Sequence, residues 1–392
     1  MNRRLFIRSI VSGLVPLLYG ISPRMWAKPV DTVRRLVLVE LAGANDGLNT
    51  LVPFGNDHYY RLRPSLGLKR KNLINLDDST ALNSALKALQ PFWEKGQMAW
   101  IQGLGYPKPN RSHFQSIALW ETASDGQSRR RRHGWMTHAV EHRMPRPIFD
   151  PHGISLAANL SLFASDTGRW LSVRNAKQLR DDALPEIPGS ASQHPSLNLL
   201  QRRLQTLNET MARLEQLIAK APPIPAFEGG ALGEQLRQVA LLIAAGLDTP
   251  VYRVRLPGFD THENQEQRHA RLLGELGSAL HDFSRQLERS SEWNNTVIMT
   301  YSEFGRRAAE NRSGGTDHGT AAPHLVLGGD INGGLYSESP DLSQLIDGDP
   351  NYTMDYRALY NQVLVGGLGA SPHTDALTEF SDSRLDKLFK IT

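Results

Sequence analysis

The sequence predicts an α/β protein with a mostly parallel β-sheet covered by helices. Two observations lead to this fold class. Apolar segments of strand length alternate along the chain with segments whose leucines recur at helical spacing. The chain can also bury a full core, because 40% of its 392 residues are hydrophobic and only 21% are charged.

Five apolar segments are predicted to form the strands. They are, in chain order, residues 34–43 (RRLVLVELAG), 97–105 (QMAWIQGLG), 251–258 (VYRVRLPG), 295–305 (NTVIMTYSEFG) and 324–331 (HLVLGGDI). Continuous apolar runs of this length are typical of strands that are buried on both faces. Leucines at helical spacing predict helices around residues 82–89 and 272–287, before the second strand and after the third.

Between about residues 181 and 235 the composition changes, and prolines flank a charged segment. Its apolar residues step alternately by three and four positions: Leu197, Leu200, Leu204, Leu207, Met211, Leu214 and Ile218. Such a seam predicts a helix that packs against a partner. We expect a helical insertion packing on this chain, with residues 236–247 as one partner; the alternatives are a homodimer contact through 197–218 and a lid over the site.

Residues 1–27 are expected to be an export signal. They begin with Arg3-Arg4 and a modest apolar run and hold no acidic residue. The pattern resembles a twin-arginine signal more than a membrane span, which needs roughly 20 apolar residues. We therefore predict export of the folded chain by the twin-arginine machinery to the periplasm or the medium, with membrane tethering if the signal is not cleaved. A disordered basic tail is the alternative.

Charge and cysteine content limit the class of protein. The four arginines of residues 1–27 account for the whole formal net charge of +4, so no nucleic-acid partner is expected. The chain has no cysteine, which excludes thiol catalysis and thiolate metal sites.

Polar side chains follow four of the predicted strands. They are Asp46 after the first strand, Arg111, Ser112 and His113 after the second, Asp260 and His262 after the third, and Glu303, Asp317 and His318 after the fourth. Ligands of open α/β sheets bind outside the carboxyl ends of the strands. We therefore expect these side chains to form one site.

Carboxylates and imidazoles without thiolates are typical ligands for zinc, manganese, magnesium or calcium. Two such ions about 4 Å apart can activate a hydroxyl nucleophile and stabilise the leaving oxygen of a phosphate or sulfate ester. Ser112 follows Arg111 at an expected helix start, where it could be that nucleophile or an anchor for an anion.

Each of these residues also has a structural interpretation. Asp46 could stabilise a turn, Ser112 or Asp260 could cap a helix, and His113 could be a core histidine. Glu303 could pair with Arg306 or Arg307. Arg111 and His113 are expected in catalytic roles beside Ser112, and Asn45 is a further, secondary candidate for the site.

Five motifs carry a resemblance to a known family. GANDGLNTLVPFGNDHYYRLRP, GLGYPKPNRSHFQS, FDTHENQEQRH, SEFGRRAAENRSGGTDHG and YTMDYR resemble the exported domain-of-unknown-function 1501 proteins, from about residue 35 to 370. That resemblance implies an alkaline-phosphatase-like three-layer sandwich, here a single domain over residues 28–392.

The resemblance also implies roles for individual residues. Asp46 would bind one metal ion near the nucleophile Ser112 and Glu303, while Asp260 and His262 would hold the other ion together with His318. Two positions depart from the family's superfamily pattern. Asp260-x-His262 replaces the usual Asp-x-x-x-His, and Phe304 after Glu303 cannot bind a metal. These departures would leave one metal site incomplete.

The implied function is an exported, two-metal hydrolase of small or polymeric anionic esters. Phosphate is favoured over sulfate, because the Cys/Ser-x-Pro-x-Arg motif of sulfatases is absent around Ser112. The alternative is an exported, non-catalytic binding or envelope-assembly protein with a degenerate metal site.

Overall fold

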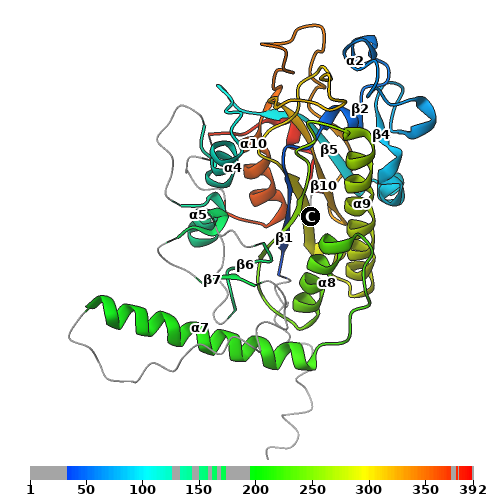
Figure 1. The fold of residues 1–392 in the computed structure, drawn as a ribbon. Helices are drawn as coiled ribbons and strands as arrows, with labels where there is room; N and C mark the ends of the chain where they lie inside the picture. Colours follow the sequence, from blue (N-terminus) through cyan, green and yellow to red (C-terminus); the bar gives the residue numbers. More distant parts are fainter. Residues whose placement is uncertain are drawn as a thin grey trace, which may run out of the picture. The chain divides into compact units, whose positions relative to one another are not determined.

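A computed structural model describes residues 33–125, 133–143, 150–157, 161–165, 169–173, 195–371, 377 and 379–390 (Figure 1). The predicted export signal lies outside these residues, as does the start of the predicted helical insertion. No helix within the described ranges is long and apolar enough to cross a membrane.

The main sheet contains nine strands within the described part of the chain. Their order is β11 (Gly334–Tyr336), β5 (Met98–Gly105), β10 (Ala322–Gly328), β9 (Thr296–Tyr301), β1 (Arg35–Ala42), β8 (Val251–Pro257), β6 (Gly153–Ser155) and β7 (Trp170–Ser172), and β12 (Met354–Asp355) also pairs with β5. β10 is antiparallel to both neighbours, and every other pair is parallel. All other strands therefore end at the edge where β10 begins.

Side chains of β1 alternate between two cores, which shows that both faces of the sheet are covered. Val37 and Val39 belong to a core that also contains residues of α8 (Gly230–Ala244) and α9 (Gln265–Arg289). Leu36 and Leu38 face a second core, formed with α4 (His113–Thr122), α5 (Trp135–Arg143) and α10 (Tyr356–Gln362). Figure 1 shows these two groups of helices on opposite sides of the sheet. The chain is thus a three-layer α/β sandwich, and the predicted fold class is confirmed.

The five predicted strands are all present, with two differences. The fourth strand ends at Tyr301, so Glu303 lies in a loop. The fifth strand begins at Ala322 and is antiparallel to both of its neighbours. The helical spacing of residues 82–89 is realised as the 3-10 helix η4 (Ser84–Leu89), which continues into α3 (Gln90–Glu94) with a proline in its first turn.

The remaining described elements are short. They are η2 (Gly47–Asn49), β2 (Leu51–Val52), α2 (Asp57–Leu62), η3 (Arg70–Asn72), β3 (Leu73–Asn75), β4 (Ala81–Asn83), η5 (Ser161–Phe163), η6 (Trp293–Asn295), the π-helix η7 (Val363–Gly367) and η8 (Ser383–Leu385). β2, β4 and β3 form a small antiparallel sheet of their own.

The heptad seam lies on one long helix, α7 (Pro195–Lys220). Leu214 is only 1% exposed and joins the core of α8 and α9, against which Met211 and Ile218 also pack. Leu197, at the other end, is 43% exposed. The carboxyl-terminal half of the seam therefore packs on this chain, as expected, and the homodimer contact stays a prediction.

Candidate metal centre

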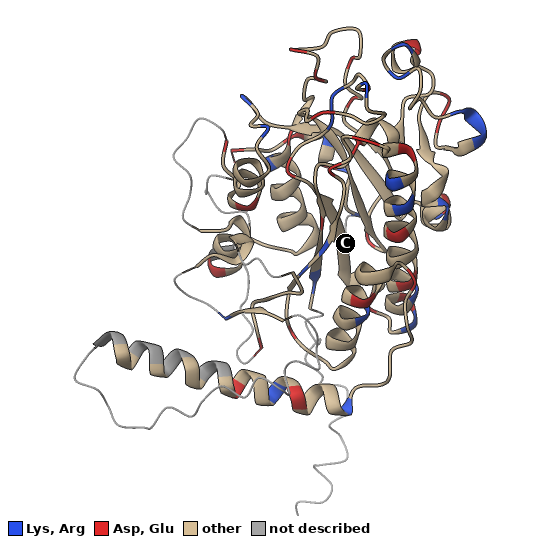
Figure 2. Cartoon of the chain, viewed as in Figure 1, with Lys and Arg blue, Asp and Glu red and all other residues tan. Residues whose placement is uncertain are grey.

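The loops that carry the predicted site residues meet at the carboxyl edge of the sheet. β1 lies between β8 and β9 and is parallel to both, so the loops after these three strands are neighbours. Acidic and basic positions both lie among these loops (Figure 2). Gly43 has a φ of +110°, and a Cβ there would lie 2.4 Å from the backbone nitrogen of Asp260. Only glycine lets these two loops approach so closely.

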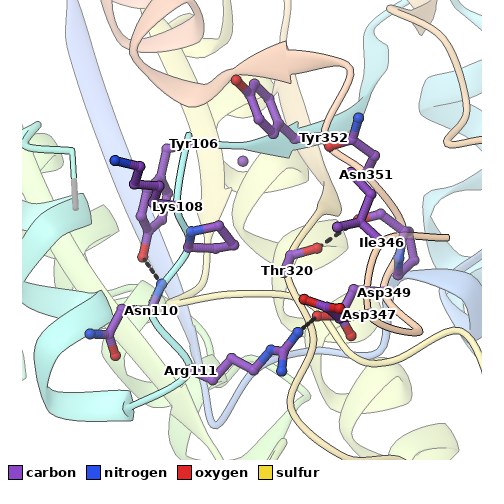
Figure 3. Close-up of a pocket in the computed structure, with 13 residues that line it drawn as sticks. Tyr106, Lys108, Asn110, Arg111, Thr320, Ile346, Asp347, Asp349, Asn351 and Tyr352 are labelled. Carbon is purple, nitrogen blue, oxygen red and sulfur yellow. Dashed lines mark hydrogen bonds and ion pairs between the residues drawn. The ribbon is translucent and has the colours of Figure 1, made fainter. Parts of the chain in front are cut away.

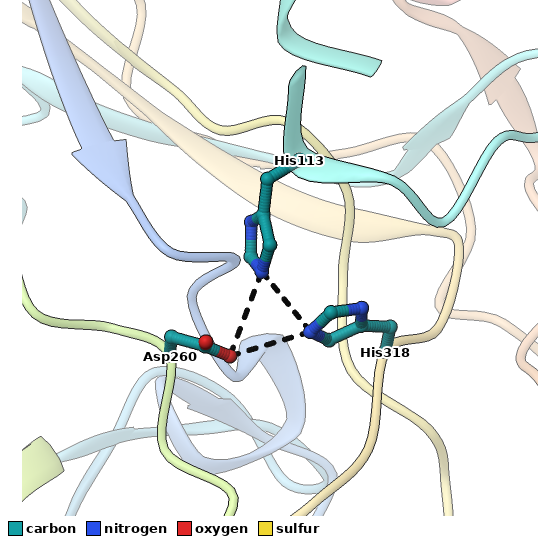
Figure 4. Close-up of side chains that lie close together, drawn as sticks. All are labelled: His113, Asp260 and His318. Atoms are coloured by element: carbon teal, nitrogen blue, oxygen red, sulfur yellow. Dashed lines mark hydrogen bonds and ion pairs between the residues drawn. The ribbon is translucent and has the colours of Figure 1, made fainter. Parts of the chain in front are cut away.

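Three side chains, one from the start of α4 and two from loops, form a group that could hold a metal ion: His113, Asp260 and His318 (Figure 4). The Nε2 atoms of His113 and His318 are 3.0 Å apart. The Oδ1 atom of Asp260 lies 3.3 Å from Nε2 of His318 and 3.6 Å from Nε2 of His113. His318 reaches this group because it precedes the reversed strand β10.

His262 adds a fourth donor to this group. Its Nε2 atom lies 2.9 Å from Nε2 of His318 and 3.0 Å from Oδ1 of Asp260. The structure therefore brings together Asp260, His262 and His318, which were predicted to share a metal ion, and places with them His113, which was predicted in the site but not as a ligand. We call these four residues the histidine cluster.

The second ring nitrogen of each histidine faces an acceptor. The Nδ1 atoms of His113, His262 and His318 lie 2.6 Å from Oε1 of Glu303, 3.3 Å from Oδ1 of Asp317 and 2.9 Å from the carbonyl oxygen of Arg111, respectively. Each Nδ1 can therefore donate its hydrogen, which leaves the lone pair of a neutral ring on Nε2. The lone pairs of His113 and His318 and the Oδ1 atom of Asp260 then lie close together, with the lone pair of His262 beside the last two, an arrangement that a bound cation would stabilise.

Glu303 supports a ligand in this arrangement. Besides the ring of His113, its carboxylate accepts hydrogen bonds from the backbone N–H of Gly43 at 2.9 Å and from the hydroxyl of Ser302 at 3.0 Å. Its hydrogen bond raises the pKa of His113, whereas burial lowers the pKa of His318. Glu303 was predicted to lie beside a metal ion; in the structure it lies behind His113, where it orients the ring.

Asp317 takes the corresponding place behind His262. Its Oδ1 atom also accepts a hydrogen bond of 3.1 Å from the side-chain amide of Asn311. The hydrogen bond from Asn311 is the largest contribution that lowers the pKa of Asp317. Asp317 was predicted as a metal ligand, and in the structure its contact with the cluster is made through His262.

Arg306 joins the loops that hold the cluster, a role that sequence reasoning missed. Its guanidinium is fully buried and donates a hydrogen bond of 2.6 Å to Oδ1 of Asp260. It also donates to four backbone carbonyls, those of Gly43, Ala44, Phe259 and Thr316. Burial alone would raise the pKa of Asp260, but the hydrogen bond from Arg306 lowers it. The sequence feature that could have indicated this role is the position of Arg306, three residues after Glu303.

Asp46 lies away from the histidine cluster. Its Oδ2 atom pairs with the guanidinium of Arg63 at 2.6 Å, and both side chains are fully buried. The side-chain amide of Gln265 donates to the same oxygen. Burial would raise the pKa of Asp46, yet Arg63 lowers it. A buried carboxylate needs a compensating charge, and here an arginine supplies it in place of the predicted metal ion.

Ser112 and Arg111 lie beside the cluster. Ser112 is exposed at the N-cap of α4, and its side chain makes no capping hydrogen bond. The carbonyl of Arg111 binds His318, while its guanidinium pairs with Asp349. Asn45, the secondary candidate, is instead buried between Thr50 and His269.

A groove of about 490 Å³ opens onto the cluster. His113, Asp260 and Glu303 line it together with Phe114, which is 88% exposed, and Arg255. The side chains of His113 and Asp260 are 30% and 47% exposed. A ligand in the groove can therefore reach the cluster.

Residues 99–364 match the family described as "Protein of unknown function (DUF1501)". No curated protein sequence matches significantly.

Solved structures with some similarity include Ps i-CgsB, with 9% identity over 90% of this chain and 75% of that chain and a TM-score of 0.41. A protein in the alkaline phosphatase superfamily from Vibrio parahaemolyticus has 12% identity over 79% of this chain and 63% of that chain, with a TM-score of 0.33. Lipooligosaccharide phosphoethanolamine transferase A, an integral membrane protein from Neisseria meningitidis, has 10% identity over 98% of this chain and 64% of that chain, with a TM-score of 0.39.

Proposed function

Because the chain belongs to the DUF1501 family of proteins of unknown function, we propose its function from its own geometry: an exported, metal-dependent hydrolase of phosphate esters, with sulfate esters less favoured. The observation that carries the proposal is the group formed by Nε2 of His113, Nε2 of His318 and Oδ1 of Asp260 beside an open groove, with Nε2 of His262 next to the last two atoms.

The spacing of these donor atoms fits a small divalent ion. In a tetrahedral zinc site with metal–nitrogen distances of about 2.0–2.1 Å, neighbouring donors are roughly 3.3 Å apart. Within the group His113, Asp260 and His318 the separations are 3.0, 3.3 and 3.6 Å. Nε2 of His262 lies 2.9 Å from Nε2 of His318 and 3.0 Å from Oδ1 of Asp260, on the side away from His113. A set rich in imidazole favours zinc over manganese, magnesium and calcium, which prefer oxygen ligands.

We propose one metal ion in this site, where the sequence predicted two. Asp46 pairs with Arg63 through Oδ2 and Glu303 binds His113, so a second ion at either carboxylate would have to compete with these contacts. Arg306 supplies a fixed positive charge beside Asp260 instead. The bound ion would polarise a phosphoryl oxygen of the ester.

Ser112 is the proposed nucleophile. It is exposed, it directly precedes His113, and its hydroxyl makes no capping bond to α4. The free N–H groups at the start of that helix favour an anionic group nearby. In this scheme Oγ of Ser112 bonds to phosphorus as the alcohol leaves, and water then cleaves the phosphoserine.

A non-catalytic metal-binding protein is the second candidate. The absence of Asp46 from the cluster favours it, because the predicted two-metal arrangement is not assembled. A protein of this kind would bind zinc tightly and hydrolyse no ester.

An isosteric pair of variants tests the metal centre. We expect Asp260→Asn to weaken zinc binding, measured by calorimetry and by the zinc-induced rise in Tm, because it removes a charged ligand. Zinc affinity should fall at least roughly tenfold. Mutation of a residue that only hydrogen-bonds to a metal ligand already lowers metal affinity about 10–100-fold. Asp46→Asn is the matched control and should keep the zinc response. Loss of zinc binding in Asp46→Asn with retention in Asp260→Asn would show that the proposed site is wrong.

Ser112→Ala tests the nucleophile. This variant should keep the zinc-induced rise in Tm and lose most hydrolysis of p-nitrophenyl phosphate, because only the attacking oxygen is removed. Full activity in Ser112→Ala would instead assign the attack to water. A zinc-loaded parent without hydrolysis would favour the binding protein.

A further inference from the structure

A second pocket, of about 680 Å³, lies on the other side of Arg111 (Figure 3). Residues 105–111 form one wall, residues 346–352 form the opposite wall, and Thr320 lies between them. Its volume is within the range of sites for small molecules. The side chains of the histidine cluster do not line it.

Arg111 connects this pocket to the histidine cluster. Its backbone carbonyl accepts the hydrogen bond from Nδ1 of His318 at 2.9 Å. Its guanidinium pairs with Asp349 at the end of the pocket (Figure 3). Thr320, two residues after His318, also lines the pocket. A ligand bound at the cluster could therefore extend past Arg111 into the pocket.

Asp349 leaves one oxygen in need of a hydrogen-bond donor. The residue is only 2% exposed, and Arg111 binds its Oδ2 atom. Its Oδ1 atom is buried and accepts no hydrogen bond from the residues that the structure describes, although Nε of Arg307 lies 3.5 Å away. A buried oxygen of this kind is costly unless a donor satisfies it. Asp349 lines the pocket, so a small rotation of its carboxylate would let a ligand hydroxyl be such a donor.

The other lining groups favour a neutral, polar ligand. The cations Lys108 and Arg111 are balanced by the carboxylates of Asp347 and Asp349, so the pocket has no net charge to attract an additional anion. Asn351 and Tyr352 add an amide and an aromatic ring to the wall. Amides bind hydroxyl groups, and the face of an aromatic ring packs against the C–H groups of a sugar.

We propose that this pocket binds a neutral, hydroxyl-rich group of the sugar or polyol class, as the part of the substrate that carries the reacting ester. The inference rests on the proposed function in one respect, the placement of the ester at the histidine cluster. Binding of the hydroxyl-rich group itself requires neither metal nor catalysis, so the two proposals can fail separately.

Direct binding is the first test. Saturation-transfer NMR with methyl α-D-glucopyranoside on the metal-free full-length chain should show transfer to the sugar protons. The double variant Asn351→Ala/Tyr352→Ala should reduce this signal roughly tenfold, because it removes one hydrogen-bonding amide and the ring. Asn208→Ala on α7 is the control and should leave the signal unchanged. No signal with the parent, or equal signals with the parent and the double variant, would overturn the proposal.

The single variant Asn351→Ala gives an interpretable result even if the double variant misfolds. Because Asn351 is exposed, its replacement should leave the fold intact. This variant should also reduce the signal, with a circular dichroism spectrum and Tm equal to those of the parent. An unchanged signal in this folded variant would count against the pocket.

Substrate comparison then separates the two proposals. With zinc bound, the double variant should lower kcat/KM for glucose 1-phosphate roughly tenfold and leave kcat/KM for phenyl phosphate unchanged. Equal losses with both esters would contradict a specific sugar pocket. Hydrolysis of neither ester by the parent, together with normal glucoside binding, would refute the proposed function and leave the pocket standing.

Discussion

At the scale of single residues, the partner of each side chain decides its role. His113 and His262 both direct Nε2 towards Nε2 of His318, and an acceptor occupies Nδ1 of each of the three rings. Asp46 and Asp260 are both carboxylates at strand ends, and both bind an arginine. The Asp46 side chain is fully buried, however, whereas Asp260 stays 47% exposed and can share its charge with a metal ion.

His324 on β10 leads to a prediction about pH. It is 1% exposed, both ring nitrogens lack a hydrogen-bond partner among the described residues, and burial lowers its pKa from 6.5 to about 3. The folded chain therefore keeps His324 neutral while the unfolded chain takes up a proton below pH 6.5. Stability should fall as the pH drops from 6.5 towards 3, by roughly 2 kcal/mol at pH 5 from this residue.

His324→Phe should remove that contribution. Urea denaturation at pH 8 measures the cost of the substitution itself, and the change between pH 8 and pH 5 isolates the proton effect. We expect this change to be about 2 kcal/mol smaller in His324→Phe than in the parent. An equal change in both proteins would mean that His324 is protonated in the folded chain.

At the scale of elements, the direction of β10 completes the site. A further parallel strand would begin at the opposite edge of the sheet, and the residues before it would lie far from Asp260. Because β10 is antiparallel to β9 and β5, the loop before it returns to the carboxyl edge. An isolated β-bridge between Arg306 and His318 then aligns the two sides of this loop.

The two ends of α7 should respond differently to a charge. Leu214→Glu buries a carboxylate in the core and should lower the free energy of unfolding by more than about 3 kcal/mol. Leu197→Glu, on the same helix but 43% exposed, is the control and should change it by less than about 0.5 kcal/mol. Urea denaturation measures both. Equal effects would contradict the packing of α7, and a dimer that dissociates in Leu197→Glu would support the homodimer contact.

At the scale of the whole molecule, the predicted export would determine where the proposed enzyme works. Replacement of Arg3 and Arg4 by lysine should retain the protein in the cytosol, because twin-arginine recognition depends on the guanidinium pair and not on charge alone. Cell fractionation measures the outcome. Arg8→Lys with Arg24→Lys is the charge-matched control and should be exported normally. Equal periplasmic amounts of the two double variants would refute a twin-arginine signal.

The sequence by itself determined the layers of the fold and the edge that carries the site. Apolar runs and helical spacing are local patterns, and strand direction places the following loops together, so Asp260, His262 and His318 could be predicted as neighbours. Only the tertiary structure decided which acid does what: Asp46 pairs with Arg63, Glu303 orients His113, and Arg306 binds Asp260. These assignments depend on distances and burial between residues remote in the chain, and local periodicity contains no information about them.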